Sequence, residues 1–345
     1  MLNFKISSPD KTLLPDITSK IDNLTKPQGS LGRLETLCSR ICLMQQSLSP
    51  TLLDPVNILF GADHGIISEG VSVSPKEVTY QQMLHFCRGG AGINFLCDIN
   101  GFRLKVIDAG VDADFPEGCG VINRKAGYGT ANFLHEPAMT SEQWEYCLKA
   151  GAEIVKETFD EGCNVISFGE MGSGNTSSSS MWMHILTGIP LADCIGAGAG
   201  LDNPGIQHKV DVLSKALANY NGSEELEEKL RWFGGFELAM AVGAMLKAAE
   251  LRMVIIVDGF IMTACIAAAA RFYPAVLDYA IFGHQGDESG HKLLIESLGG
   301  EPVLHLGLRL GEGSGAVCAY PIIKAAVAMV NNMDSFKKVQ VTKYF

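Results

Sequence analysis

Short apolar runs that alternate with helix-like segments dominate the chain between residues 55 and 320. Five short, mainly apolar runs lie at 56–60, 104–107, 165–168, 254–257 and 280–282. Runs of this kind are typical of strands buried on both faces, and helices between them indicate βαβ units. The pattern therefore predicts an α/β fold with a parallel, Rossmann-like sheet flanked by helices.

The first fifty residues have a different pattern, in which apolar positions recur at helical intervals. Such positions extend over 17–24 and again over 31–41, and the turn-forming segment 26–30 separates them. We expect two helices here, and Ser30 in the turn before the second is its candidate cap. Lys26 lies in the same turn, where it could contact an anionic ligand or remain solvated.

Composition and charge narrow the class of protein. The chain has 345 residues, of which 47% are hydrophobic and 19% charged, and this is typical of a folded globular protein. A formal net charge of −11 argues against a nucleic-acid-binding surface, although a local basic loop could still bind phosphate. Ten scattered cysteines without a Cys-x-x-Cys pair indicate reduced thiols in a cytoplasmic protein.

The longest apolar stretch, 253–270, does not predict a membrane span. Asp258 and Gly259 interrupt it, so that it falls short of the length a bilayer requires. We interpret it as a buried strand followed by a helix of small residues. No membrane association is expected.

Glycine stands beside a polar side chain after each predicted strand. These strand ends are the segments 61–65, 108–110, 169–176, 258–259 and 283–288. Ligands of parallel α/β folds bind beyond the carboxyl ends of the strands, where such loops meet. The sequence therefore predicts a ligand site assembled from these five loops.

The segment 170–180 is the best candidate for a phosphate cradle. Gly172 and Gly174 would leave backbone N–H groups free, and the following Asn175 and Thr176 could open a helix whose N-terminus favours anions. A serine-rich helix cap without a ligand is the open alternative. The segment is not a nucleotide P-loop, and 196–200 does not match the dinucleotide fingerprint Gly-x-Gly-x-x-Gly.

Glu312 is the first candidate for a catalytic base, because it is a carboxylate set among glycines at 311, 313 and 315. The alternative is that these glycines only shape the start of a helix, with Glu312 favouring its positive N-terminal end. Three histidines, His64, His284 and His291, lie near carboxylates and could suggest a metal site. We favour hydrogen-bonded histidines, and expect no metal and no cofactor.

Seven segments, in order over nearly the whole chain, closely resemble the nicotinate-nucleotide:dimethylbenzimidazole phosphoribosyltransferase family. They are KPQGSLG at 26–32, GADHG at 61–65, EGVS at 69–72, GEMGSGNT at 169–176, GAGLD at 198–202, DGF at 258–260 and LRLGEG at 308–313. The resemblance implies transfer of ribose 5-phosphate from nicotinate mononucleotide to 5,6-dimethylbenzimidazole or a related lower-ligand base. Nicotinate would leave, and the product would be an α-ribazole 5′-phosphate for cobalamin assembly.

The resemblance also implies a domain organisation and an oligomeric state. Residues 51–320 would form the α/β catalytic domain, and the terminal segments 1–50 and 321–345 would together form a smaller helical lobe. The family is usually homodimeric, so we expect a homodimer. The protein should bind small-molecule substrates and not nucleic acid.

Site residues follow from the resemblance only where the motif is present. Glu312 would be the catalytic base, and Glu170 would act at the ribose as a second catalytic carboxylate. The base would be bound by Ser74, Gln82 and Leu310. The ribose and phosphate would be bound by Gly172, Ser173, Gly174, Asn175, Thr176, Lys209, Gln285 and Gly286.

Departures from the family pattern leave alternatives open. Gly286 stands where the family usually has serine, and Ser289 stands where it commonly has proline. Residues 80–88 differ enough that adenine or a phenol could be the acceptor. A purine-type nucleoside phosphorylase and a catalytically silent nucleotide-binding or carrier protein are the other hypotheses. Release of nicotinate from nicotinate mononucleotide would exclude the silent protein.

Overall fold

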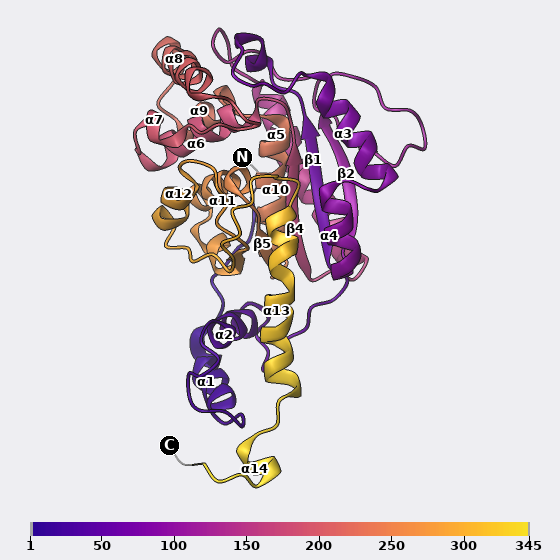
Figure 1. Cartoon of the computed structure of the whole chain (residues 1–345), viewed down its shortest axis with the longest axis vertical. Coiled ribbons are helices and arrows are strands. Elements are labelled where there is room, and N and C mark those ends of the chain that lie inside the picture. Colours follow the sequence, from indigo (N-terminus) through magenta and orange to yellow (C-terminus); the bar gives the residue numbers. More distant parts are fainter. Residues whose placement is uncertain (1–2, 344–345) are drawn as a thin grey trace.

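The computed structural model describes residues 3–343, and a six-stranded parallel sheet lies at its centre (Figure 1). The strands are β1 (Val56–Ala62), β2 (Arg103–Gly110), β3 (Ile122–Asn123), β4 (Val165–Met171), β5 (Val254–Val257) and β6 (Ala280–Phe282). Every adjacent pair is parallel, in the order β3-β2-β1-β4-β5-β6. This confirms the predicted parallel α/β fold, and all five predicted runs lie in strands.

Helices connect the strands and cover the sheet. They are α1 (Leu14–Asp22), α2 (Arg33–Gln45), α3 (Glu77–Arg88), α4 (Gly92–Asn100), α5 (Ser141–Asp160), α6 (Asn175–Thr187), α7 (Leu191–Cys194), α8 (Asn203–Asn219), α9 (Leu226–Trp232), α10 (Phe236–Glu250), α11 (Phe260–Phe272), α12 (His291–Ser297), α13 (Ser314–Asn332) and α14 (Phe336–Val339), with 3-10 turns at Lys11–Leu13, Gly65–Glu69 and Pro274–Tyr279. Every residue of β1 is buried. The central strand is thus covered on both faces, which explains its apolar composition.

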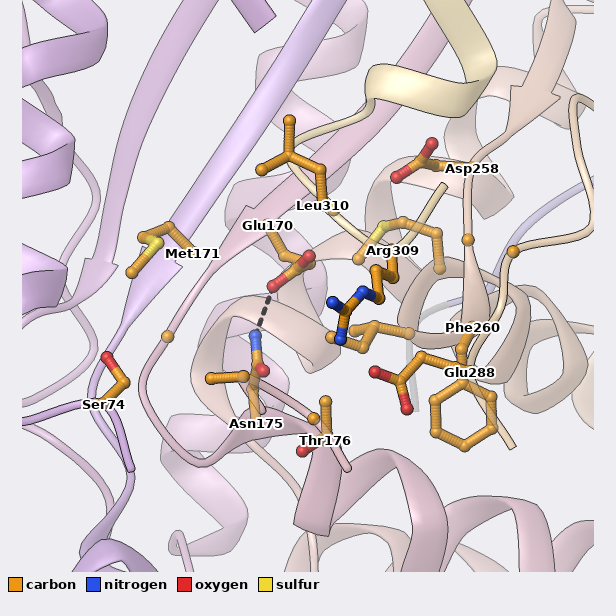
Figure 2. Close-up of a pocket in the computed structure, with 18 of the residues that line it drawn as sticks. Ser74, Glu170, Met171, Asn175, Thr176, Asp258, Phe260, Glu288, Arg309 and Leu310 are labelled. Atoms are coloured by element: carbon orange, nitrogen blue, oxygen red, sulfur yellow. Dashed lines mark hydrogen bonds between the residues drawn. The ribbon is translucent and has the colours of Figure 1, made fainter. Parts of the chain in front are cut away.

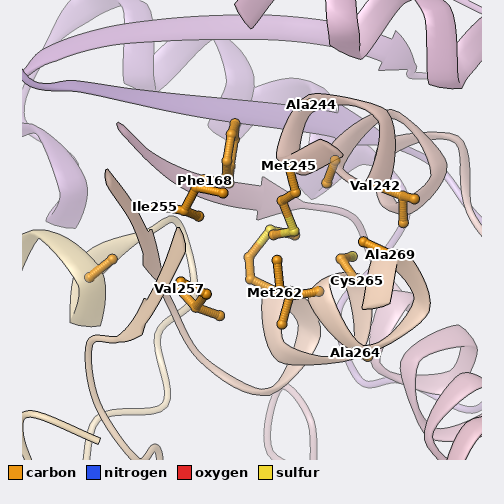
Figure 3. Close-up of a cluster of buried hydrophobic side chains, with 14 of the residues drawn as sticks. Phe168, Val242, Ala244, Met245, Ile255, Val257, Met262, Ala264, Cys265 and Ala269 are labelled. Carbon is orange, nitrogen blue, oxygen red and sulfur yellow. The ribbon is translucent and has the colours of Figure 1, made fainter. Parts of the chain in front are cut away.

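Apolar helices pack closely on the middle of the sheet (Figure 3). Helix α10 contacts β1, β2, β4 and β5, and it also contacts α5 and α11. Met245 of α10 and Met262 of α11 lie with Phe168 and Ile255 in one buried cluster. Small residues, such as Ala264 in this cluster, let the helices approach closely. The stretch 253–270 is the strand and helix predicted for it, and all ten cysteines are free thiols.

Helices from the two terminal segments of the chain lie together, away from the sheet. Figure 1 shows α1, α2, the far end of α13 and α14 in this region. Helix α2 contacts α13, and an antiparallel bridge pairs Leu24 with Ser335. The division into domains remains a prediction, and the boundary placed at 320–321 falls inside α13. By length and composition alone α13 could cross a membrane, but 61% of its apolar window is buried inside the fold, as in a core helix.

The turn between α1 and α2 differs from both expectations for it. Helix α2 begins after Gly32, with φ +48°, and not at a Ser30 cap. Lys26 is 5% exposed, and its Nζ lies 2.8 Å from Glu35 Oε1. Lys26 is therefore buried and not solvated, and Glu35 in the first turn of α2 supplies its counter-charge.

Candidate active site

A cleft lies beyond the carboxyl ends of β4, β5 and β6, next to the boundary between the paired strands β1 and β4 (Figure 2). This position is the topological switch point of the sheet, where ligands bind in open α/β folds. The cleft is lined by Ser72, Ser74, residues 170–176, Gly198, Ala199, residues 258–262, His284, Gly286, Glu288 and residues 308–311. It thus brings together the predicted residues Ser74, Glu170, Leu310, Gly286 and the whole loop from Gly172 to Thr176.

The Glu312 carboxylate lies at the N-terminus of α4, one residue beyond the cleft-lining Gly311. Its side chain is 8% exposed, and Oε2 accepts a hydrogen bond from the Ile93 backbone N–H at 3.0 Å. The glycines do shape the start of the following helix α13 (Ser314–Asn332), whose N-cap is Gly313, but the Glu312 carboxylate turns back to the N-terminus of α4 and not to that of α13. Burial raises the pKa of Glu312, and Asp258 adds to the rise while the Ile93 hydrogen bond opposes it.

The Glu312 backbone is left-handed, with φ +65°, a conformation that costs energy in a residue other than glycine. Its carbonyl oxygen accepts a hydrogen bond from Asn57 Nδ2 at 3.0 Å, and Asn57 Oδ1 accepts one from Ser167 Oγ at 2.7 Å. A Cβ added at Gly169 of β4 would lie 2.2 Å from the Glu312 carbonyl carbon. The two central strands therefore fix this backbone by direct contact.

Asp258, directly after β5, lies at the N-terminus of α13, the helix that follows Glu312. Its two oxygens accept hydrogen bonds from the backbone N–H groups of Gly313 at 3.1 Å and Ala316 at 3.0 Å. The side chain is 1% exposed, and burial raises its pKa. Asp258 thus holds the chain immediately after Glu312, a role that the sequence did not indicate.

Glu170 projects from the end of β4 into the middle of the cleft (Figure 2). Asn175 donates a hydrogen bond to its carboxylate. Gly311 passes so close that an added Cβ would lie 2.3 Å from Glu170 Oε1. Burial raises the pKa of Glu170 to about 8, with smaller contributions from the neighbouring carboxylates that include Asp258 and Glu312. Burial therefore favours the protonated form of this carboxyl group.

Lys209 supports the predicted phosphate cradle from beneath. It comes from α8, is 1% exposed, and donates a hydrogen bond from Nζ to Thr176 Oγ1 at 2.8 Å. Burial lowers its pKa to about 8, and Glu288 acts in the opposite direction. Thr176 is in the first turn of α6, whose start after Gly174 (φ +90°) has no side-chain cap. An anion at this helix N-terminus would meet the positive end of the helix dipole and a buried ammonium.

The remaining predicted residues divide between the cleft and its surroundings. Ser74 Oγ lies 3.0 Å from Ser173 Oγ at the cleft wall. Gln82 is half-buried on α3 and does not line the cleft. Gln285 is half-buried, and its backbone N–H donates to the Leu304 carbonyl at 2.9 Å. The structure thus does not bring Gln82 or Gln285 to the cleft.

The histidines behave mainly as hydrogen-bonded groups. His64 Nε2 lies 2.6 Å from Glu237 Oε1, and both side chains are fully buried beneath the Gly172 loop. His291 Nδ1 accepts from the Gly286 N–H at 2.9 Å, and burial lowers the pKa of His291 to about 3. His284, by contrast, lines the cleft. The absence of a metal remains a prediction.

Arg309 is the main cleft residue to which no role was assigned from the sequence. It is exposed, lines the cleft, and lies between the predicted base-pocket residue Leu310 and Leu308 along the chain. Its place within the LRLGEG motif was the available signal. Its direction into the cleft could not be known without the fold.

Comparisons with known proteins agree with this geometry. A family model described as phosphoribosyltransferase matches residues 6–341. The chain is 58% identical to a nicotinate-nucleotide–dimethylbenzimidazole phosphoribosyltransferase of Bacteroides fragilis over 100% of both chains, and 46% identical to that of Dechloromonas aromatica over 99% of both. A solved structure of the same-named enzyme from Thermus thermophilus superposes with a TM-score of 0.92, at 35% identity, covering 97% of this chain and 100% of that one.

Proposed function

Because the chain belongs to the nicotinate-nucleotide–dimethylbenzimidazole phosphoribosyltransferase family, we propose that it transfers ribose 5-phosphate from nicotinate mononucleotide to 5,6-dimethylbenzimidazole. Nicotinate leaves, and α-ribazole 5′-phosphate forms for cobalamin assembly. The observation that best supports this proposal is the buried Glu312 carboxylate, fixed beside the cleft with one oxygen held by the Ile93 N–H. The other oxygen is left to accept a proton.

The reaction needs a proton acceptor more than a proton donor. Nicotinate is bonded to the sugar as a cationic pyridinium, so the electron pair of the breaking C–N bond neutralises the departing ring. The acceptor imidazole attacks through one nitrogen and must lose the proton of the other. Glu312 takes this proton, and its raised pKa brings its basicity closer to working pH.

Glu170 acts on the sugar. Positive charge develops on the ribose as the bond to nicotinate breaks, and an ionised carboxylate in a water-poor cleft stabilises it. The cationic donor itself favours ionisation of Glu170, because an opposite charge nearby lowers the pKa of a carboxyl group. Binding of the donor therefore prepares the group that stabilises the transition state.

The α6 N-terminus and Lys209 bind the phosphate of the donor. The phosphate does not react, so its binding energy fixes the sugar between Glu170 and the acceptor. The acceptor lies on the side of Ser74 and Leu310, because the Leu310 side chain and the Glu312 carboxylate both lie beside Gly92. We further infer a cytoplasmic homodimer, which rests on the family alone.

A panel of acceptors tests the proposed function. The purified protein is incubated with nicotinate mononucleotide and either 5,6-dimethylbenzimidazole, adenine or a phenol, and nicotinate release is followed together with product mass. We expect release that depends on the base, and a ribotide of dimethylbenzimidazole. Release only with adenine or a phenol would change the acceptor, and phosphorolysis of a nucleoside without base exchange would support the phosphorylase alternative.

A further inference from the structure

The N-terminus of α11 forms a second end of the cleft, separate from the cradle at α6. Helix α11 has 13 residues and begins after Gly259, and no side chain caps it. Gly259, Phe260 and Ile261 all line the cleft. The first N–H groups of a helix have no partner within the helix, and together with the helix dipole they favour an anion.

His284 adds a buried polar group without a partner at this end. It lines the cleft and is 3% exposed. Within residues 3–343 its Nδ1 has no hydrogen-bond partner, and its Nε2 lies 3.6 Å from Asp258 Oδ1, beyond hydrogen-bond length. The Asp258 oxygens already accept from the N–H groups of Gly313 and Ala316. A buried polar group left unpaired beside a cleft is one that a ligand can satisfy.

Arg309 supplies a full positive charge. Figure 2 shows its guanidinium between Glu170 and Asn175 on one side and Phe260 and Glu288 on the other. Glu288 also lines this part of the cleft, but its carboxylate is offset by Lys209 and Arg309 and accepts a hydrogen bond from the Gly198 backbone. A guanidinium can bind a planar carboxylate through two parallel hydrogen bonds.

The proposed donor carries two anionic groups, a 5′-phosphate and a carboxylate on the pyridine ring. The cleft likewise has two helix N-termini, and the one at α6, above Lys209, is accounted for by the phosphate. We propose that the α11 N-terminus, His284 and Arg309 bind the pyridine carboxylate and thereby select nicotinate mononucleotide over nicotinamide mononucleotide. This inference rests on the proposed function and assigns residues to donor selection.

Isothermal titration calorimetry without an acceptor tests this assignment. Nicotinate mononucleotide and nicotinamide mononucleotide differ only in a carboxylate and a neutral carboxamide, so the ratio of their Kd values isolates recognition of the charge. We expect the wild type to bind the acid about 10- to 100-fold more tightly, the range of a hydrogen bond to a charged group. We expect Arg309→Gln to bring the ratio of Kd values close to 1, chiefly because the variant binds nicotinate mononucleotide more weakly.

Two further variants make the test specific. His284→Gln should lower the ratio in the same direction, and its thermal unfolding is compared with that of the wild type. Lys209→Gln is the matched control. It should weaken the binding of both nucleotides by a similar factor and therefore leave the ratio of their Kd values unchanged. Arg309 is exposed, so Arg309→Gln should fold even if His284→Gln does not.

Three results would overturn the inference. The wild type could bind acid and amide equally well, Arg309→Gln could leave the ratio unchanged, or Arg309→Gln could weaken both nucleotides equally. The last result would place the shared phosphate or ribose at the α11 end. Failure of the proposed function is distinguishable, because the wild type would then release no nicotinate in the acceptor panel.

Discussion

Glu312 combines a strained backbone with a buried carboxylate, and the residues around it compensate for both. A left-handed conformation costs a residue other than glycine about 1–3 kcal/mol, and it persists only where neighbouring contacts determine it. Asn57 holds the Glu312 carbonyl, Asp258 holds the next N–H, and Ile93 holds the carboxylate. We interpret this arrangement as preorganisation, since a base that must reach one proton works best in one fixed position.

Asn57→Leu should reduce transfer while sparing donor binding. The change keeps the approximate size but removes the amide that holds the Glu312 carbonyl, so we expect kcat to fall by about 10-fold or more with little change in the donor KM. Ser167→Ala is the control. It removes only the hydrogen bond from Ser167 Oγ to Asn57 Oδ1 and leaves the bond from Asn57 to Glu312, so kcat should fall less. A kcat for Asn57→Leu that equals the wild-type value would show that the backbone needs no such support.

Titration of Glu170 should lower the free energy of unfolding of the substrate-free protein as pH rises. The pKa of Glu170 is raised to about 8 from an ordinary value of 4.5, so the folded state binds more protons than the unfolded state between these values. Stability from this group is present below about pH 4.5 and is lost as pH rises through 8. Glu170→Gln should therefore have a Tm similar to that of the wild type at pH 5 and about 2–5 °C higher at pH 9. Parallel Tm profiles would contradict the raised pKa.

Among the elements, the strands and the loops after them could be predicted well from the sequence. Strands buried on both faces leave a continuous apolar signal, and glycine beside a polar group marks each strand end. Strand β3 was not predicted, because its two residues, Ile122 and Asn123, have no periodicity. The start of α2 was misplaced because Gly32, rather than a polar cap, allows the chain to turn.

The N-terminus of helix α6 and Lys209 should bind the donor phosphate together. Lys209 donates a hydrogen bond to Thr176, which lies in the first turn of α6. Lys209→Ala removes a charge-assisted contact, so the donor KM should rise by about 10-fold or more while the KM of the base changes little. Lys215, on the same helix α8, provides a matched control, since it has no assigned contact with the cleft and Lys215→Ala should leave both constants unchanged. An unchanged donor KM in Lys209→Ala would refute the phosphate assignment.

At the scale of the whole molecule, the strand order makes the site and could not be predicted from the sequence. The order β3-β2-β1-β4-β5-β6 places β1 beside β4, although about one hundred residues separate them along the chain. This pairing brings Asn57 of β1 next to Ser167 of β4 and under Glu312. Only tertiary structure reveals such contacts, and the same holds for Arg309 and His284. The resemblance indicated several residues that line the cleft, but Gln82 and Gln285, which do not line it, show that it does not fix every side chain.

The most direct test of the central claim compares Glu312→Gln with the wild type in two measurements on the same preparation, donor Kd by calorimetry and transfer to dimethylbenzimidazole by product mass. Glutamine keeps the size and can retain the Ile93 hydrogen bond, but it cannot accept the acceptor's proton. We expect a donor Kd within about 3-fold of the wild-type value and a loss of transfer of at least about 100-fold. Transfer near the wild-type rate would mean that another group, or water, takes the proton, and the role assigned to Glu312 would be wrong.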